Sequence, residues 1–396
     1  MVPSLRKTFN ENFTRKKYDD FLNELDGLYP GAREFRLAET PIFVPKDFLK
    51  KMTATCDAIV DLILDPAFLP ATDRSIPPGE KVPGSYGNPQ MLVFDFGICT
   101  DNDGNLSPQL VEMQGFASMY AFQEIYAQVL SKHFSIPSNY TPYPGNFTST
   151  DFTELFRKVV LGNHAPENVV LLELTPHQQK TRIDFYCTRD MTGIQPVCIT
   201  DLIKEGKALY YLRDGKKTRI NRIYNRLIFD ELHARKDLTG AMDITQELDV
   251  EWVPHPDWFY RISKFTLPFI SHPNVPETFF LDEIKQLPAR LEDYVLKPLF
   301  SFAGQGVVID VTVEDIEDID DAHHYILQRK VNYANIIETP IAPAKAEIRL
   351  MYLWEEGKPR PVPAINLARL SRGKMIGTRY NKDMEWVGGS IAFFEH

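Results

Sequence analysis

The chain has few cysteines and no long apolar run, and each shortage excludes a class of protein. Its four cysteines show no CxxC spacing, so neither a structural zinc site nor a disulfide framework is expected. No run of about 18 apolar residues occurs, and residues 1–10 lack the apolar core of a signal peptide. We therefore expect a cytoplasmic protein with no membrane span.

Positive charge is also in short supply. Lys and Arg number 44 against 54 Asp and Glu, which gives a net charge of −10. This balance repels a polyanion, so a dedicated DNA-binding protein is not expected, although a local basic pocket for phosphates remains open. With 396 residues, 43% of them hydrophobic, the chain has the composition of a globular protein of two or three structural modules.

Local patterns divide the chain into a helical opening, a β-rich block and later α/β segments. Apolar residues at three- to four-residue spacing predict helix over residues 13–64, and a proline-rich stretch at 66–89 ends it. Residues 91–96 and 109–114 predict two strands of a hairpin around the turn-forming residues 100–105. Further expected elements are a helix at 117–134, a buried strand at 169–174, a hairpin leading into a helix at 208–227, and strands at 294–297, 306–310, 325–328 and 346–353.

A possible phosphate-binding segment lies near residue 300. A predicted strand carries Lys297, and the loop after it contains Gly304 and Gly306. Glycine lets backbone N–H groups approach phosphates closely, while lysine adds a positive charge at the same place. The segment is neither a Rossmann fingerprint, which needs a helix after the glycines, nor a P-loop, which needs Gly-Lys-Ser/Thr. Alone, it also fits an ordinary β-hairpin with a solvated lysine.

Further candidate residues lie on both sides of this segment. Lys264 upstream offers a second lysine, and Gln328 lies on a predicted strand downstream. Glu347 and Arg349 stand at i and i+2 of another predicted strand, so both side chains project to one side, where a nucleotide cleft can lie. Arg372 closes the polar stretch that follows.

These parts, in this order, resemble the ATP-grasp superfamily and specifically its circularly permuted glutathionylspermidine synthetase-like branch. In that branch one ATP lysine precedes a His-Pro-Asn stretch, a second lies on a Val-Lys-Pro strand with a glycine-rich loop, and a downstream Gln lies near the adenine hinge. The resemblance covers residues 85–396. The matching residues are Ser263, Lys264, His272, Pro273, Asn274, Lys297, Pro298, Gly304, Gly306 and Gln328.

The resemblance also implies magnesium ligands near the N-terminus, as an Asp on one strand and a Glu-x-Asn on the next. Asp95, Glu112 and Gln114 fill these positions. Side chains alternate along a strand, so Glu112 and Gln114 share one face, and oxygen ligands of this kind suit Mg²⁺. Two positions depart from the family: Gln114 replaces Asn, and Val93 stands where relatives have Arg.

The turn of the hairpin contains a partial calcium-loop pattern. Asp101, Asp103, Asn105 and Glu112 occupy positions 1, 3, 5 and 12 of an EF-hand loop, but position 6 is Leu106 where the motif requires Gly. A solvated turn is the expected structure at residues 101–105.

The resemblance implies an α+β protein with a circularly permuted ATP-grasp fold and an α/β pre-ATP-grasp-like domain. A helical N-terminal segment would span residues 1–84, and a β-hairpin and helix with the metal ligands would span 85–150. The pre-ATP-grasp-like substrate domain would span 151–255 and the nucleotide-binding region 256–396. Residues near 90–115 should then lie against those near 290–370 in one ATP cleft.

The activity implied by the resemblance is that of an ATP-dependent carboxylate–amine ligase, which forms an amide or peptide bond through an acyl phosphate. Its cofactors would be ATP and Mg²⁺, and its partners small-molecule carboxylates and amines, with neither nucleic acid nor membrane. The oligomeric state stays open. The roles implied are nucleotide binding for Lys264, Lys297, Gly304, Gly306 and Gln328, and magnesium binding for Asp95, Glu112 and Gln114. Arg349 and Arg372 would stabilise the transferred phosphoryl group or a substrate carboxylate.

Two alternatives remain. A phosphotransferase on the same scaffold would pass the phosphoryl group to a hydroxyl and stop there. A non-catalytic nucleotide-binding protein is the other alternative, and the departures at Val93 and Gln114 motivate it.

Overall fold

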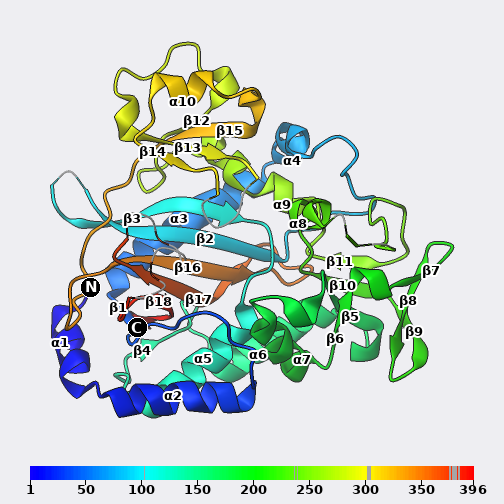
Figure 1. Ribbon diagram of the computed structural model, residues 1–396, viewed down its shortest axis with the longest axis horizontal. Helices are drawn as coiled ribbons and strands as arrows, with labels where there is room; N and C mark the ends of the chain where they lie inside the picture. Colours follow the sequence, from blue (N-terminus) through cyan, green and yellow to red (C-terminus); the bar gives the residue numbers. More distant parts are fainter. Residues whose placement is uncertain are drawn as a thin grey trace.

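A five-stranded antiparallel sheet forms the centre of the molecule (Figure 1). The computed structural model describes residues 1–396 except 102, 236, 239, 301–304, 374–375, 377–380 and 382–383. The strands of the central sheet, in spatial order, are β18 (Gly388–Ser390), β17 (Val362–Ser371), β16 (Lys345–Leu353), β2 (Met91–Thr100) and β3 (Leu106–Gln114).

The predicted hairpin is confirmed, because β2 and β3 pair antiparallel around the turn at residues 101–105. Asp95 lies opposite Glu112, and the register shifts just beyond this pair. In the turn, Asp101 Oδ1 accepts hydrogen bonds from the backbone N–H groups of Asp103 and Asn105, at 3.0 and 2.8 Å. This carboxylate therefore stabilises the turn itself.

The expected helical opening is interrupted by a strand. Residues 42–44 form β1 (Ile42–Val44), which pairs parallel with β19 (Ala392–Glu395). This pairing is invisible to a local pattern, because its two halves lie about 350 residues apart in the chain. β4 (Tyr140–Thr141) completes this small sheet, and the helices of the opening are α1 (Pro3–Asn12), α2 (Arg15–Leu28), α3 (Lys46–Leu64) and α4 (Phe68–Thr72).

Helices cover both faces of the central sheet. On one face α3 packs Met52, Cys56 and Ile59 against alternate sheet residues such as Phe94 and Phe96. On the other face α5 (Tyr120–His133) and α6 (Ser149–Leu161) pack against Val93 and Met351. The period-two alternation of the strands thus separates two apolar cores.

A parallel sheet forms a second unit (Figure 1). Its strands, in spatial order, are β11 (Glu251–Val253), β10 (Arg222–Asn225), β5 (Val169–Glu173) and β6 (Gln195–Cys198). α7 (Arg182–Thr192) lies between β5 and β6 in the chain, and α8 (Phe229–Ala234) follows β10. A separate antiparallel sheet consists of β7 (Ile203–Glu205), β8 (Ala208–Arg213) and β9 (Lys216–Ile220).

A small antiparallel sheet forms a third unit and lies at the top of Figure 1, beyond β2 and β3. Its spatial order is β12 (Thr278–Phe280), β15 (Tyr325–Arg329), β13 (Tyr294–Pro298) and β14 (Val308–Ile309). In the chain, the short helix α9 (Trp258–Arg261) precedes β12, and α10 (Val313–Glu317) follows β14. Among the described helices, none has both the length and the apolar character needed to cross a membrane.

Candidate functional site

One face of the central sheet changes from apolar to charged along its strands. Val93 and Met351 are paired neighbours in the core beneath α5. Two residues later on β2 and two residues earlier on β16, on the same face, the register pairs Asp95 with Arg349. The sheet therefore carries a charged cluster where its helical cover ends.

Asp95 is the centre of this cluster and is only 1% exposed. Arg349 donates from Nε to Oδ1 and from Nη2 to Oδ2, both at 2.6 Å, and Arg369 Nη2 donates to Oδ2 at 2.7 Å. Burial alone would raise the pKa of Asp95, but the two arginines outweigh it and hold the pKa below its ordinary value. Both carboxylate oxygens are therefore engaged by cations of the chain itself.

Glu347 extends the cluster along β16. Arg369 Nη2 lies 3.1 Å from its Oε2, and the Tyr333 hydroxyl donates to its Oε1. Burial raises the pKa of Glu347, and the nearby Asp95 and Glu112 act in the same direction. The Tyr333 ring lies over Gly97, where a Cβ would come within 2.7 Å of it, so this arrangement requires glycine.

The two predicted ATP lysines approach the hairpin from its outer edge. The stretch before β12 runs along β3, because Gly115 N donates to Ile262 O and Leu110 N donates to Asn274 O, both at 2.7 Å. This brings Lys264 Nζ to 3.5 Å from Glu112 Oε1.

Lys297 lies on β13 of the small sheet, and its side chain extends to the β2–β3 hairpin. Its Nζ donates to Val111 O at 3.2 Å and to Gln328 Oε1 at 2.5 Å. Burial lowers the pKa of Lys297 to about 8, since the opposing effect of Glu112 is smaller and Lys264 adds a second positive charge nearby. A negatively charged ligand would relieve this repulsion.

Gln328 has an open donor beside the lysines. Its side chain is buried on β15, and its Nε2 has no hydrogen-bond partner among the described residues. Gly306 has φ +72°, and a Cβ there would lie 2.8 Å from Pro298 Cγ, so the backbone requires glycine. Gly304 lies outside the described residues.

The structure thus brings together Asp95, Glu112, Lys264, Lys297, Gln328 and Arg349 around the β2–β3 hairpin. Gln114 lies at the end of β3, opposite Val93. Arg372 lies apart from this group: its Nη2 donates to Glu385 O at 2.9 Å. β17 ends at Ser371, so Arg369, two residues before that end, is the arginine of this strand that reaches Asp95. Sequence reasoning missed Arg369 and Tyr333.

No protein-family model matches the chain, and no curated protein matches it. A solved structure does: a glutathione synthetase-like effector from Globodera pallida, in its apo form, with a TM-score of 0.57. The match covers 95% of this chain and 96% of that chain, at 13% sequence identity. The two chains share a fold.

This glutathione synthetase-like fold is compatible with the ATP-grasp-like architecture that the resemblance implies, since both combine α and β elements in several sheets. At 13% identity the likeness extends to the fold alone. The circular permutation and the domain boundaries stay predictions.

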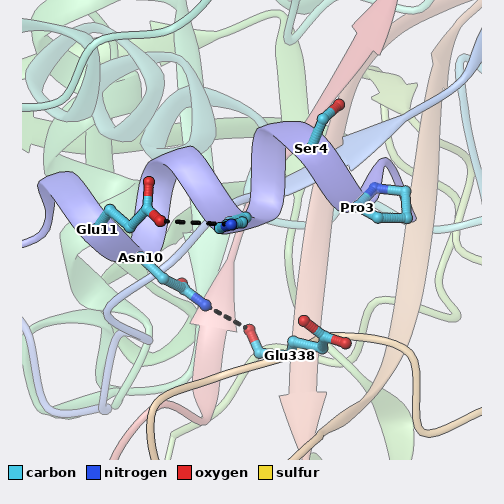
Figure 2. A pocket seen from close by; sticks show the side chains of 6 residues that line it. Pro3, Ser4, Asn10, Glu11 and Glu338 are labelled. Atoms are coloured by element: carbon cyan, nitrogen blue, oxygen red, sulfur yellow. Dashed lines mark hydrogen bonds and ion pairs between the residues drawn. The ribbon is translucent and has the colours of Figure 1, made fainter.

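Two hollows lie outside the charged cluster. One of about 490 Å³ lies between α1 and Glu338, where Asn10 Nδ2 donates to Glu338 O and Lys7 pairs with Glu11 (Figure 2). The other, of about 670 Å³, lies beside β12 and is lined by apolar residues such as Phe269 and Phe279 together with charged ones such as Glu277 and Lys285. Within the described ranges, no group of three or more His, Cys, Asp and Glu side chains is arranged to hold a metal.

Proposed function

We propose that this chain is an ATP-dependent carboxylate–amine ligase. The observation that carries the proposal is the meeting of Lys264 and Lys297, from separate segments, at the Glu112 edge of the β2–β3 hairpin. Two adjacent, largely desolvated ammonium groups repel each other, and a polyphosphate is the ligand that compensates both charges. The shared glutathione synthetase-like fold supports this assignment.

The residues present fit a nucleotide. Lys264 and Lys297 supply cations for its phosphates, and Gln328 Nε2, which has no partner in the described ranges, supplies a buried donor for an acceptor of the ligand. Leaving such a donor unpaired costs about 1–3 kcal/mol, so an acceptor from the ligand would stabilise the site.

Magnesium fits two of its three predicted ligands. Glu112 is partly exposed, and Gln114 projects from the same face of β3. Mg²⁺ commonly takes one or two carboxylates and completes its shell with phosphates and water, so these two residues would hold it beside a nucleotide. When bound, the ion neutralises charge that develops on the transferred phosphoryl group. Both oxygens of Asp95 already accept hydrogen bonds from arginines, which makes this residue the weakest candidate of the three.

In this proposal the arginines of the charged cluster would stabilise the reacting groups. Asp95 fixes Arg349 and Arg369, and Arg369 Nε has no partner within the part of the chain that the structure describes. In the proposed reaction a substrate carboxylate attacks the γ-phosphate, ADP leaves, and an amine displaces phosphate from the acyl phosphate. Such chemistry depends on positioning and charge stabilisation and needs no protein nucleophile. All four cysteines are buried, and burial raises the pKa of Cys56, Cys99 and Cys187, which makes these three thiols unreactive.

A second candidate is a non-catalytic nucleotide-binding protein. It is favoured by the engagement of Asp95 with two arginines, which leaves its oxygens occupied. Val93 stands where the branch that the sequence resembles has Arg, and this departure also favours a non-catalytic protein.

A screen of ATP consumption across amino acids, polyamines and small peptides, with product mass, separates the alternatives. Phosphate together with an amide product supports the ligase, and a phosphorylated product identifies a phosphotransferase. Nucleotide binding without turnover across the panel favours the non-catalytic protein. Absence of nucleotide binding would refute all three.

A further inference from the structure

The parallel sheet reverses its chain order between β5 and β10. From β5 the chain passes to β6 on one side, and it later returns to β10 on the other side, with β11 beyond. In open parallel sheets, ligands bind at the carboxyl ends of the strands at such a switch point. Here those ends carry Glu173 on β5 and Asn225 followed by Arg226 on β10.

Two buried donors at this switch point have no acceptor among the residues that the structure describes. Asn225 is 1% exposed, and its Oδ1 accepts from Leu227 N, but its Nδ2 has no partner in the described part of the chain. Arg226 is also buried; its Nη1 donates to Asp184 Oδ2 at 2.8 Å, whereas its Nε is equally unpartnered. An unpaired buried donor is destabilising, so an acceptor supplied by a ligand would stabilise this edge of the sheet.

Glu173 adds a third polar group at the same edge. It is 5% exposed and accepts a hydrogen bond from Leu174 N at 2.7 Å. Burial raises its pKa to about 8 and Glu231 adds to this effect, while Leu174 N–H and Arg226 oppose it. At neutral pH the carboxyl group is therefore mostly protonated and able to donate.

The backbone is strained next to this group. Thr175 adopts φ 38° and ψ 59°, a left-handed conformation that a β-branched residue rarely takes. Backbone strain of this kind is destabilising and clusters at ligand-binding positions.

One residue joins the switch point to the charged cluster of the central sheet. The carbonyl oxygen of Ser118 accepts from Arg226 Nη1 at 2.5 Å, and its hydroxyl accepts from Arg349 Nη1 at 3.0 Å. A small molecule at the edge of the parallel sheet would thus lie within one residue of the arginines proposed to act on the reacting carboxylate.

We infer that the switch point between β5 and β10 binds the carboxylate substrate, and that this substrate is a small dicarboxylate. One carboxylate would accept from Asn225 Nδ2 and Arg226 Nε, and the other would extend past Ser118 toward Arg349 and Arg369. This inference rests on the proposed ligase function and specifies its substrate class. We infer two carboxylates because the donors without a partner among the described residues form two groups: Asn225 Nδ2 and Arg226 Nε at the parallel sheet, and Arg369 Nε at the central sheet, with Ser118 bonded to an arginine of each sheet.

The test uses straight-chain probes of matched length: the dicarboxylates from succinate to adipate, their diamides and the corresponding diamines. Thermal shift and calorimetry on the full chain, with and without ATP and Mg²⁺, should show binding of a dicarboxylate and of neither counterpart. Asn225→Asp replaces the open donor with an acceptor and should weaken dicarboxylate binding about tenfold or more, equivalent to 1.4 kcal/mol. Asn163→Asp places the same charge on an exposed position of the chain and should leave binding unchanged.

A second variant decides the question even if Asn225→Asp does not fold. Glu173→Gln keeps the shape and the donor capacity of the protonated carboxyl group, so dicarboxylate binding should persist. If the wild type instead bound a diamine in preference to a dicarboxylate, and Glu173→Gln lost the diamine binding, the switch point would be an amine site and the inference would be overturned. Undiminished dicarboxylate binding in a folded Asn225→Asp protein, or no dicarboxylate binding by the wild type, would overturn it too. If ATP still raises the unfolding temperature when one of these results is obtained, the dicarboxylate inference fails and the proposed nucleotide site stands. If ATP does not raise the unfolding temperature of the wild type, the proposed function itself is refuted.

Discussion

Arg349 donates two parallel hydrogen bonds of 2.6 Å to the carboxylate of Asp95, although the residues lie 254 positions apart in the chain. They are direct register partners on β16 and β2, so the sheet itself sets the two side chains face to face. Bidentate arginine–carboxylate pairs combine strength with a fixed orientation. Asp95 therefore acts in this structure as an anchor that orients Arg349 and, through its second oxygen, Arg369.

Asp95→Asn should destabilise the fold by about 3–5 kcal/mol, the cost of removing one partner from a buried ion pair. The loss arises because Arg349 would keep its charge without the carboxylate that it pairs with, while Arg369 would keep only its ion pair with Glu347. Urea unfolding measures it, with Asp101→Asn as a control, because an Asn side chain can still accept the hydrogen bonds of that exposed turn. Equal stability of Asp95→Asn and wild type would show that the ion pair contributes little.

Lys297→Met should fold normally and lose most of its stabilisation by ATP. Methionine keeps the apolar stem that packs at the hairpin, but it removes the cation proposed for the phosphates. A ligand at 100 times its Kd stabilises a protein by about 2.7 kcal/mol, a shift that thermal unfolding resolves easily. Lys285→Ala, which removes an exposed lysine near the small sheet, should respond to ATP as the wild type does. If Lys297→Met also responds fully, the lysine does not contact the nucleotide.

ATP affinity should fall as the pH rises through about 8, where Lys297 loses its proton in the folded protein. The free energy of unfolding of the protein without ATP should change in the opposite direction over this pH range. Because the folded pKa is lowered, the unfolded lysine binds the proton more tightly, so the unliganded protein should gain stability from this group between about pH 8 and 10.5. Lys297→Arg keeps its charge throughout this range and should flatten the affinity profile, measured by calorimetry. The same slope in both proteins would assign the titration to another group.

Glu112→Gln should reduce Mg²⁺-dependent ATP turnover by a factor on the order of 10² or more, as expected for a main electrostatic contributor. The substitution keeps shape and hydrogen-bonding capacity and removes one charge. Asp103→Asn, in the turn of the same hairpin, should have almost no effect, since among the described residues Asp103 takes part in the turn through its backbone N–H, which the substitution keeps. If Glu112→Gln kept the Mg²⁺-dependent ATP turnover of the wild type and Asp103→Asn lost it, the metal would lie in the turn.

The sequence by itself determined the elements that carry the site. Alternating apolar residues around a turn-forming stretch encode the β2–β3 hairpin, and this hairpin sets Asp95 opposite Glu112. The strands with Lys297 and Arg349 also follow from local pattern, because side-chain alternation depends only on neighbouring residues.

Only the tertiary structure decided which partners these side chains meet. The exact end of β17 selects Arg369 over Arg372, and the packing of Tyr333 over Gly97 brings a hydroxyl to Glu347. Such pairs join strands that are remote in the chain, and their geometry depends on register and burial, which a local pattern does not contain. The pairing of Asp95 with arginines is one of the contacts that only the tertiary structure decided. The sequence contains a carboxylate suited to a metal, and the fold pairs this carboxylate with Arg349 and Arg369.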